Sequence, residues 1–333
     1  LIVSHRLTDE KKEEEAALIA VLLHDIGHSP YSHAHERLII DADHEAIGKM
    51  IMLQFAKTLG SQLDLAYDMF TGKYNRPFFH QLISGQLDLD RLDYLSRDSF
   101  YTGVAEGVVG HDRILRMLRE VDNKLVVEEK GLYSIEKFLV ARRIMYWQVY
   151  LHKTALAAEL MAKAVIRLLR EQDAGERAGY LAPELEFFLS KKVKIQDFRD
   201  HPDELLAIFS DLDDISVDYS IKRLQDHFYT PLSFLTTNLF HRKLHKLRWS
   251  DEPLEDEMIN DIRKKCQEKY DWSPEIADKM IWLGSETKAD YNREDDEIQI
   301  LTKSEEIKPF SSFLETPVRI AFNKKYYICH PSV

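Results

Sequence analysis

A histidine and an aspartate stand side by side where a short apolar stretch of the chain ends. His24-Asp25 closes this stretch, and two more histidines, His28 and His33, follow within nine residues. Burying a charged aspartate is costly unless it is paired or binds a cation. Adjacent helical residues point about 100° apart, so His24 and Asp25 suit a shared ion beyond the helix end better than each other. The structural alternative is a helix-terminal histidine beside the C-terminal dipole, which the further histidines disfavour.

A second polar segment, residues 84–98, could complete such a site. If this segment is helical, one face carries Asp90, Asp93, Tyr94, Arg97 and Asp98, and another face carries Leu89, Leu92 and Leu95. By spacing alone, a solvated polar face with internal ion pairs explains the pattern equally well. The segment therefore indicates a site only in combination with the first one.

Taken together, the two segments resemble the HD-domain phosphohydrolases, in particular the deoxynucleoside triphosphate triphosphohydrolases and their bacterial relatives. His24 and Asp25 match the family pair in its context H-D-I-G-H-x-P-[FY]-S-H, and Asp90 matches the distal aspartate in D-x-D-R-x-D-Y-x-x-R-D. A third matching block extends from Ala141 to Lys153. The resemblance spans residues 22–153 and implies a mainly α-helical fold.

The resemblance implies one divalent metal ion, bound by His24, Asp25 and Asp90. Mixed imidazole and carboxylate ligands suit Mn, Fe, Co, Ni or Zn, and less naturally Mg. The family has a further histidine ligand some tens of residues upstream of the pair. His5 is too close to the pair to match it, so we expect that ligand to precede Leu1. The alternative is a variant with an impaired metal site.

Three more histidines acquire roles through the resemblance. His44 would donate or accept a proton at the scissile P–O bond, and Glu45 would orient its ring. His28 and His33 match positions that contact the phosphates and the leaving oxygen, so His28 joins the catalytic set. Taken alone, His44-Glu45 is more typical of a helix N-terminus with a favourable acidic residue, and the surrounding motif favours the catalytic role.

The resemblance also assigns the substrate contacts. Arg91 and Arg142 match cationic phosphate contacts, which the guanidinium fork serves well. Tyr94 and Asp98 match positions that hold the sugar, with Asp98 accepting a hydrogen bond from a 3′-hydroxyl. Tyr150 matches a ring that packs against the sugar and can exclude a 2′-hydroxyl.

Three residues of the third matching block, 141–153, each have two alternative roles. Tyr146 is either a substrate contact or a core residue packed against its i+4 neighbour. His152 and Lys153 contact either the substrate or a neighbouring subunit.

The function that follows is metal-dependent hydrolysis of a deoxynucleoside triphosphate to deoxynucleoside and triphosphate. A nucleotidase or phosphodiesterase could use the same metal site. A catalytically inactive HD protein that binds nucleotides for regulation is the alternative outside enzymology. We also expect a homo-oligomer and consider a nucleotide effector, for which the basic stretch 242–246 is a candidate patch.

The elements that position these residues are predicted to be mainly helices. A helix capped by Thr8 should run to about Asp25, with its second half buried because residues 16–23 are apolar on every side. Further helices are expected at 41–59, 62–70, 78–86, 88–100 and 111–121. The pattern then predicts a hairpin over 125–133 with its turn at Lys130-Gly131, and one long helix from Ser134 to Glu171.

A segment with two glycines and a proline, residues 173–183, marks the expected boundary between an HD domain (1–175) and a C-terminal helical lobe (176–333). Late short strands are expected at 297–301, 318–322 and 325–329. The remaining histidines, read as surface or capping residues, are His80, His111, His201, His227, His241, His245 and His330.

Composition excludes several classes of protein. A net charge of −12 over 333 residues argues against broad nucleic-acid binding. Two cysteines exclude a disulfide scaffold and a multi-thiolate metal site, and suit a reducing cytoplasm. No uncharged apolar run approaches the ~18 residues of a membrane span, so we expect no membrane contact.

Overall fold

The chain folds into two compact units, each assembled from separate stretches of sequence. The computed structural model describes residues 7–8, 10–287, 297–313 and 324–333. The first unit comprises Leu1–Ile26, Gly48–Tyr150 and Lys288–Phe322, and the second comprises Gly27–Ile47, Leu151–Thr287 and Asn323–Val333. The units therefore interleave along the chain, whereas the division expected near residue 175 follows it linearly. Both are mainly helical with a few short strands, which confirms the predicted fold class.

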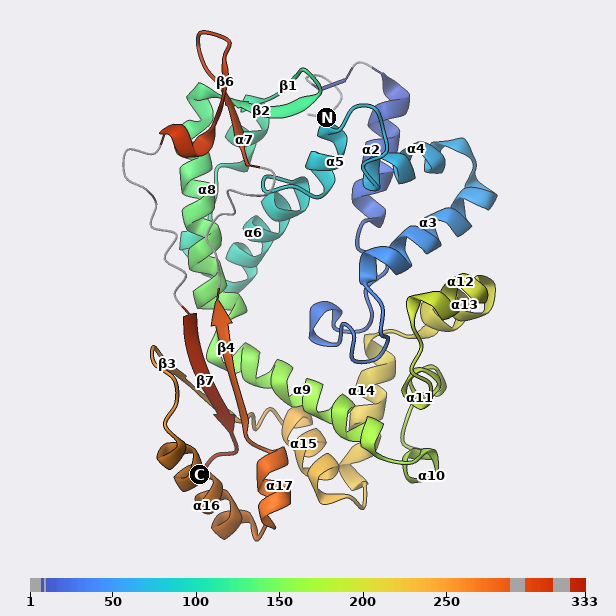
Figure 1. Ribbon diagram of the computed structural model, residues 1–333, viewed down its shortest axis with the longest axis vertical. Coiled ribbons are helices and arrows are strands. Elements are labelled where there is room, and N and C mark those ends of the chain that lie inside the picture. The colour runs from blue at the N-terminus through green and yellow to red at the C-terminus, as the bar shows by residue number, and fades with distance from the viewer. Residues whose placement is uncertain (1–6, 9, 288–296, 314–323) are drawn as a thin grey trace. The chain divides into compact units, whose positions relative to one another are not determined.

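The first unit combines helices with a small mixed sheet (Figure 1). Its helices are α2 (Lys11–Leu23), α3 (His44–Leu59, whose first turn belongs to the second unit), α4 (Ser61–Phe70), α5 (Phe78–Ile83), α6 (Leu89–Thr102), α7 (His111–Met117) and α8 (Leu132–Met145). A π-helical segment, η4 (Tyr146–Tyr150), continues α8. Its sheet has the order β1 (Leu118–Val121), β2 (Lys124–Glu128), β5 (Gln299–Leu301), β6 (Ile307–Pro309). The β2–β5 pair is parallel, and the β1–β2 and β5–β6 pairs are antiparallel.

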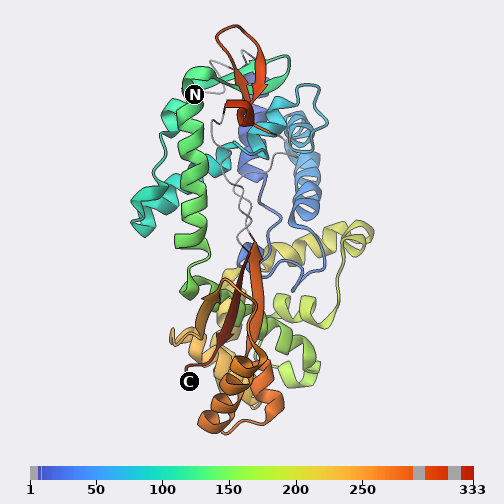
Figure 2. The same ribbon diagram turned by 60° about the vertical axis from the view of Figure 1, so that its left-hand side comes forward.

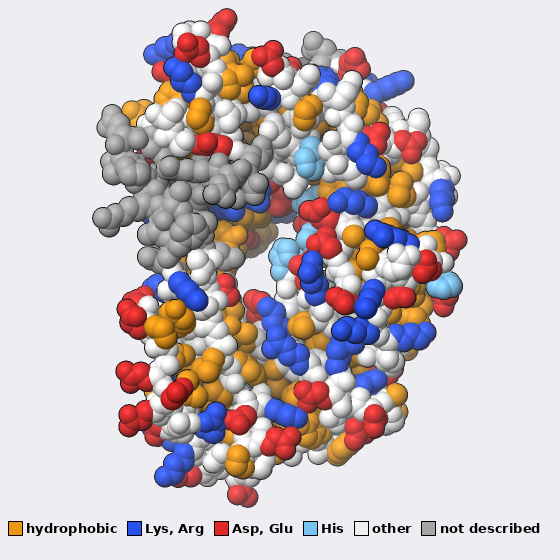
Figure 3. Space-filling model, viewed as in Figure 1, with side chains coloured by type: hydrophobic (Ala, Val, Ile, Leu, Met, Phe, Trp, Pro, Cys, Tyr) orange, Lys and Arg blue, Asp and Glu red, His pale blue; other side chains and the backbone are white. Residues whose placement is uncertain are grey.

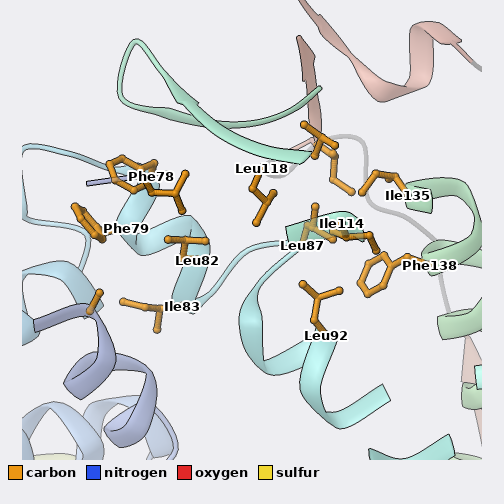
Figure 4. Close-up of a cluster of buried hydrophobic side chains, with 14 of the residues drawn as sticks. Phe78, Phe79, Leu82, Ile83, Leu87, Leu92, Ile114, Leu118, Ile135 and Phe138 are labelled. Carbon is orange, nitrogen blue, oxygen red and sulfur yellow. The ribbon is translucent and has the colours of Figure 1, made fainter. Parts of the chain in front are cut away.

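The core of the first unit fixes α6 against α8 (Figure 4). Phe78 and Phe79 of α5, Leu92 of α6 and Phe138 of α8 are all buried in one continuous apolar cluster. Full burial of a side chain of this size contributes about 1.5–3 kcal/mol. This packing leaves the opposite face of α6 to the polar residues discussed below.

The second unit is a group of helices with a three-stranded antiparallel sheet. Its helices are α9 (Lys153–Glu171), α10 (Ala174–Arg177), α11 (Pro183–Ser190), α12 (Ile195–Asp200), α13 (Pro202–Asp211), α14 (Asp214–Arg223), α15 (Thr230–Phe240), α16 (Asp256–Tyr270) and α17 (Pro274–Lys279). Its strands are β3 (Lys246–Ser250), β4 (Trp282–Thr287) and β7 (Lys324–His330). Figure 2 shows β7 between the other two, in the order β3-β7-β4.

A loop at the start of the second unit, residues 27–43, carries several of the predicted site residues. The guanidinium of Arg170 on α9 donates to the backbone carbonyls of Leu38 and Ile39, at 2.7 Å each. The amide of Asp41 donates to the carbonyl of Val193 at 2.9 Å. These contacts fix the loop although it contains only a short 3₁₀ turn, Ser32–Ala34.

The first helix differs from its prediction in two ways. Glu10, not Thr8, is the N-cap residue of α2, while the Thr8 hydroxyl donates to the buried carboxylate of Glu13. The apolar second half is not fully buried, because Leu18 and Leu22 are 55% and 80% exposed. The prediction of full burial, made because residues 16–23 are apolar on every side, was therefore wrong for part of this helix.

The predicted hairpin is misplaced. The hairpin joins β1 to β2 through Asp122-Asn123, both of which adopt positive φ, as a type I′ turn requires. The predicted helix over 111–121 therefore ends at Met117. Lys130 and Gly131 lie in a short 3₁₀ turn instead.

The long predicted helix is also interrupted. The α-helix α8 ends at Met145, η4 follows, and α9 begins at Lys153, with the His152 side chain accepting from the amide of Thr154 at its N-cap. The expected strands at 297–301 and 325–329 are confirmed as β5 and β7, while 318–322 lies outside the described residues. Of the histidines read as surface or capping residues, three are buried, namely His227, His245 and His330, and His227 is the C-cap residue of a 3₁₀ turn.

Candidate functional site

The His24 ring is positioned by the end of α2. Its Nδ1 lies 2.7 Å from the carbonyl oxygen of Val21, a hydrogen bond that places the proton on Nδ1 and leaves the lone pair on Nε2. That Nε2 lies 3.3 Å from Oδ2 of Asp25 and 3.8 Å from Oδ1 of Asp90. The three side chains predicted as metal ligands therefore converge within the first unit.

The electrostatics of this cluster favour a cation. Burial raises the pKa of Asp90, and the charge of Asp25 raises it further, against the opposing effect of His24. The three candidate ligand atoms lie within 4.8 Å of one another. One imidazole with its Nδ1 already engaged and two carboxylates form a donor set that fits a divalent ion such as Mn, Fe, Co, Ni or Zn. His5, the other histidine weighed as a ligand, lies outside the described residues.

A residue that the sequence reading did not single out, Asp88, holds Arg91 in place. Asp88 is buried, caps α6 by accepting from the Arg91 amide at 2.7 Å, and forms an ion pair with the Arg91 guanidinium. Burial raises the pKa of Asp88 despite these contacts. An aspartate at the first position of the predicted helix 88–100 is the signal that could have revealed this role.

Farther along α6, the residues predicted to contact the sugar form an aromatic cluster. The Tyr150 hydroxyl donates to Oδ2 of Asp98 at 2.6 Å, across 52 residues of sequence. The Tyr150 ring lies edge-on to Tyr94 and Tyr146, with ring centroids 6.0 and 5.3 Å away. Burial raises the pKa of Tyr94 to about 12, and burial together with Asp98 raises that of Tyr150 still higher. The guanidinium carbon of Arg142 lies 5.8 Å from the Tyr146 ring centroid.

Of the five residues predicted on the polar face of α6, three are half-buried and two are exposed to solvent. Asp90, Tyr94 and Asp98 are half-buried, whereas Asp93 and Arg97 are exposed and form a surface i,i+4 ion pair at 3.4 Å. Tyr146 is half-buried beside Tyr150, so both of its predicted interpretations remain compatible with its surroundings.

In the second unit, three imidazoles pack together, and two of them contact one carboxylate. The rings of His28 and His44 stack with centroids 3.9 Å apart and planes 13° from parallel. His33 lies edge-on to both, at 4.7 and 5.6 Å. Nδ1 of His44 lies 2.7 Å from Oε1 of Glu36, and Nδ1 of His33 lies 3.3 Å from its Oε2.

Glu36 is the second residue that the sequence reading missed. The expected partner of His44 was Glu45, whose amide donates to the Asp43 side chain at 2.9 Å, but the carboxylate at Nδ1 of His44 is that of Glu36. Burial works against the charge of Glu36, yet the hydrogen bonds from His44 and His33 lower its pKa to about 2. No regular spacing links Glu36 to His44, because a loop separates them.

Comparison with known proteins shows the family of this chain. The HD domain family matches residues 1–98, and the HD associated region matches residues 109–182. A solved phosphohydrolase of Bacteroides thetaiotaomicron is 39% identical, with a TM-score of 0.89, over 97% of this chain and 81% of that chain. The chain belongs to the HD-domain phosphohydrolases.

Curated HD relatives match over a shorter region. The protein YwfO of Bacillus subtilis is 35% identical over 170 residues, which are 49% of this chain and 39% of that protein. A protein of Dictyostelium discoideum named deoxynucleoside triphosphate triphosphohydrolase SAMHD1 homolog is 25% identical over 169 residues, 45% of this chain and 33% of that protein. The chain thus spans less than half the length of these two relatives.

Two further observations concern the charges on the surface and the length of the helices. On the face drawn in Figure 3, acidic and basic side chains of the described residues are intermixed. Among the helices of the described residues, none combines the length and apolar character needed to cross a bilayer.

Proposed function

We propose that this HD phosphohydrolase cleaves deoxynucleoside triphosphates into deoxynucleoside and triphosphate. The observation that carries the proposal is the hydrogen bond between Tyr150 and Asp98, which joins two predicted sugar contacts from different segments of the first unit. It forms on the same helix that carries the proposed metal ligand Asp90. A metal ligand and a sugar pocket on one helix suit a substrate that presents a phosphate and a deoxyribose together.

The spacing along α6 supports this substrate class. Asp90, Tyr94 and Asp98 follow one another at intervals of four residues, so they lie along one side of the helix with about 6 Å of rise between neighbours. Arg91 and Arg142 add guanidinium groups suited to bidentate contacts with phosphate oxygens. We assign Tyr150 to the wall that excludes a 2′-hydroxyl and Asp98 to the 3′-hydroxyl.

His24, Asp25 and Asp90 would hold the divalent metal ion. Such an ion neutralises phosphoryl oxygens and lowers the pKa of water. His44 would transfer a proton at the scissile P–O bond, with Glu36 holding its Nδ1–H so that Nε2 faces outward for the transfer. Only Ile26 and Gly27 separate Asp25 from His28 along the chain.

The Dictyostelium relative supports the substrate class through its name, at 25% identity. A nucleotide effector and a homo-oligomer stay predictions that accompany the proposal. The basic stretch 242–246 stays the candidate patch for such an effector.

Product analysis tests the proposal directly. The protein is incubated with dNTPs, NTPs, nucleoside monophosphates and a phosphodiester, each with Mn or Mg, and the products are separated by chromatography. Release of intact triphosphate from dNTPs is the expected result. Cleavage of monophosphates or diesters instead would establish a nucleotidase or phosphodiesterase, and nucleotide binding without turnover would establish an inactive regulatory protein.

Substitutions in the sugar pocket test its assignment. Tyr150→Ala should lower activity on dGTP while narrowing the gap to GTP, because it removes the excluding wall. Asp98→Ala should weaken catalysis on both nucleotides, by roughly 1.5–3 kcal/mol, since both carry the 3′-hydroxyl. An unchanged ratio of kcat/KM for dGTP and GTP in Tyr150→Ala would show that the pocket is misplaced.

A further inference from the structure

The histidine cluster of the second unit has the composition of a metal site in its own right. The candidate ligand atoms of His28, His33 and His44 all lie within 4.8 Å of one another. They are separate residues from His24, Asp25 and Asp90, which form their own group in the first unit. The three imidazoles come from one loop and the first residue of α3, within 17 residues of sequence.

Glu36 prepares two of these rings for metal binding. Its two carboxylate oxygens face Nδ1 of His44 at 2.7 Å and Nδ1 of His33 at 3.3 Å. A carboxylate at Nδ1 favours the tautomer with the proton on that nitrogen, which leaves the lone pair on Nε2. Metal-binding histidines usually have such a carboxylate or carbonyl partner on the second ring nitrogen.

Metal binding requires two of the rings to move. Tetrahedral zinc with Zn–N bonds of about 2.0–2.1 Å brings ligand nitrogens to about 3.3 Å from one another. The His33 side chain is 75% exposed and belongs to a three-residue 3₁₀ turn, so its ring can move inward without disturbing a packed core. His28 and His44 are half-buried and stacked in nearly parallel planes, so the His28 ring must also turn out of this stack before both nitrogens can point at one ion.

We propose that His28, His33 and His44 form a second divalent-cation site, selective for zinc and similar transition metals. Three neutral imidazoles with a fourth, open position are a ligand set that zinc adopts in proteins. Magnesium and calcium prefer oxygen ligands and should not bind there. Glu36 acts as a positioning residue that orients two of the ligands.

This site has a functional consequence that rests on the proposed function. A zinc ion on His44 occupies the nitrogen that would carry the proton at the scissile bond. Zinc at this site should therefore inhibit hydrolysis that another metal supports at His24, Asp25 and Asp90. Binding itself does not depend on that role and can be measured without substrate.

Metal titration of an Asp90→Asn variant isolates the second site. We expect the variant to bind one equivalent of Zn²⁺ by calorimetry, and Co²⁺ to show the visible absorption of a tetrahedral nitrogen-ligated ion. The further substitution His33→Ala should weaken this binding at least about 100-fold, and Glu36→Gln should weaken it about 10- to 100-fold. His241→Ala, an exposed histidine of the same unit, should leave it unchanged. Because His33 is exposed, its replacement should not impair folding, which circular dichroism verifies.

Two results would overturn the proposal. One is the absence of Zn²⁺ binding in Asp90→Asn, and the other is binding that His33→Ala leaves intact. The inhibition is tested separately, by adding Zn²⁺ to hydrolysis supported by Mn²⁺ and then removing it with a chelator. Zinc that binds at the cluster without inhibiting would uphold the site and instead contradict the proton-transfer role of His44.

Discussion

Glu36 is a half-buried carboxylate with an imidazole on each oxygen. The hydrogen bonds from His44 and His33 lower its pKa to about 2, so it is charged at neutral and mildly acidic pH. A permanent charge in this position holds the His44 ring in one tautomer and one orientation. The proposed proton transfer therefore depends on Glu36 as well as on His44.

Glu36→Gln should lower kcat about 10- to 100-fold while the metal at His24, Asp25 and Asp90 is retained. The amide can still fill the space, but it does not hold the His44 tautomer as a carboxylate does. Glu45→Gln is the matched control, because it removes the neighbouring carboxylate without touching the one at Nδ1. Steady-state kinetics and metal analysis compare both variants with wild type. Equal losses in the two variants would contradict the assignment to Glu36.

Tyr150→Phe separates the hydroxyl of Tyr150 from its ring. The substitution removes the donor to Asp98 but keeps the aromatic wall. We expect kcat/KM to fall about 10-fold or more for dGTP and GTP alike, since a hydrogen bond to a charged group contributes roughly 1.5–3 kcal/mol. The dGTP-to-GTP ratio should stay at the wild-type value, in contrast to Tyr150→Ala. A changed ratio in Tyr150→Phe would place the selectivity in the hydroxyl instead.

At the scale of elements, α6 connects the core to the site. Leu92 and Leu95 are buried on one side, and Asp90, Tyr94 and Asp98 are half-buried on another. The helix begins at a buried aspartate cap, so its first turn, which carries the proposed metal ligand, is fixed by Asp88. The Asp88 cap therefore also fixes the position of the proposed metal ligand Asp90, because both lie at the N-terminus of α6.

Asp88→Ala should destabilise the protein by about 2 kcal/mol or more. Loss of the N-cap hydrogen bond lowers the free energy of unfolding by about 0.5–2 kcal/mol. In addition, Arg91 loses its ion-pair partner. Asp93→Ala breaks an exposed i,i+4 ion pair with Arg97 on the same helix and should change stability by less than about 0.5 kcal/mol. Urea denaturation of both variants measures the difference. A similar midpoint for the two would show that the cap is not what secures α6.

The elements also show what the sequence could and could not reveal. Helices with clear periodicity, such as α3 and α6, lie close to their predicted ranges, and the convergence of His24 with Asp90 follows the family pattern. The hairpin was misplaced because Asp122-Asn123 adopts positive φ without a glycine, a weaker turn signal than Lys130-Gly131. Glu36 lies in a loop whose conformation depends on Arg170, 134 residues later, and no local pattern encodes such a contact.

At the scale of the whole molecule, the buried histidines of the second unit set an acid limit on stability. His245 is 6% exposed, stacked on Trp282, and its Nε2 has no hydrogen-bond partner in the described structure. Burial, assisted by the neighbouring His330, lowers the pKa of His245 to about 3. His330 is fully buried, and burial lowers its pKa as well. Both histidines are therefore neutral in the folded protein under conditions in which an unfolded chain would protonate them.

The free energy of unfolding should consequently fall as the pH drops below about 6.5. In that range the unfolded chain takes up protons at these histidines, whose ordinary pKa is about 6.5, whereas the folded protein does not until the pH approaches the lowered values. Each such group contributes a slope of at most about 1.4 kcal/mol per pH unit. His245→Phe keeps an aromatic ring against Trp282 and removes the titrating group, so its stability should fall less steeply between about pH 6.5 and 5. The exposed His241→Phe should retain the wild-type slope, and urea denaturation at several pH values measures all three proteins. Parallel curves for wild type and His245→Phe would show that His245 is not the source of the acid sensitivity, and would shift attention to His330.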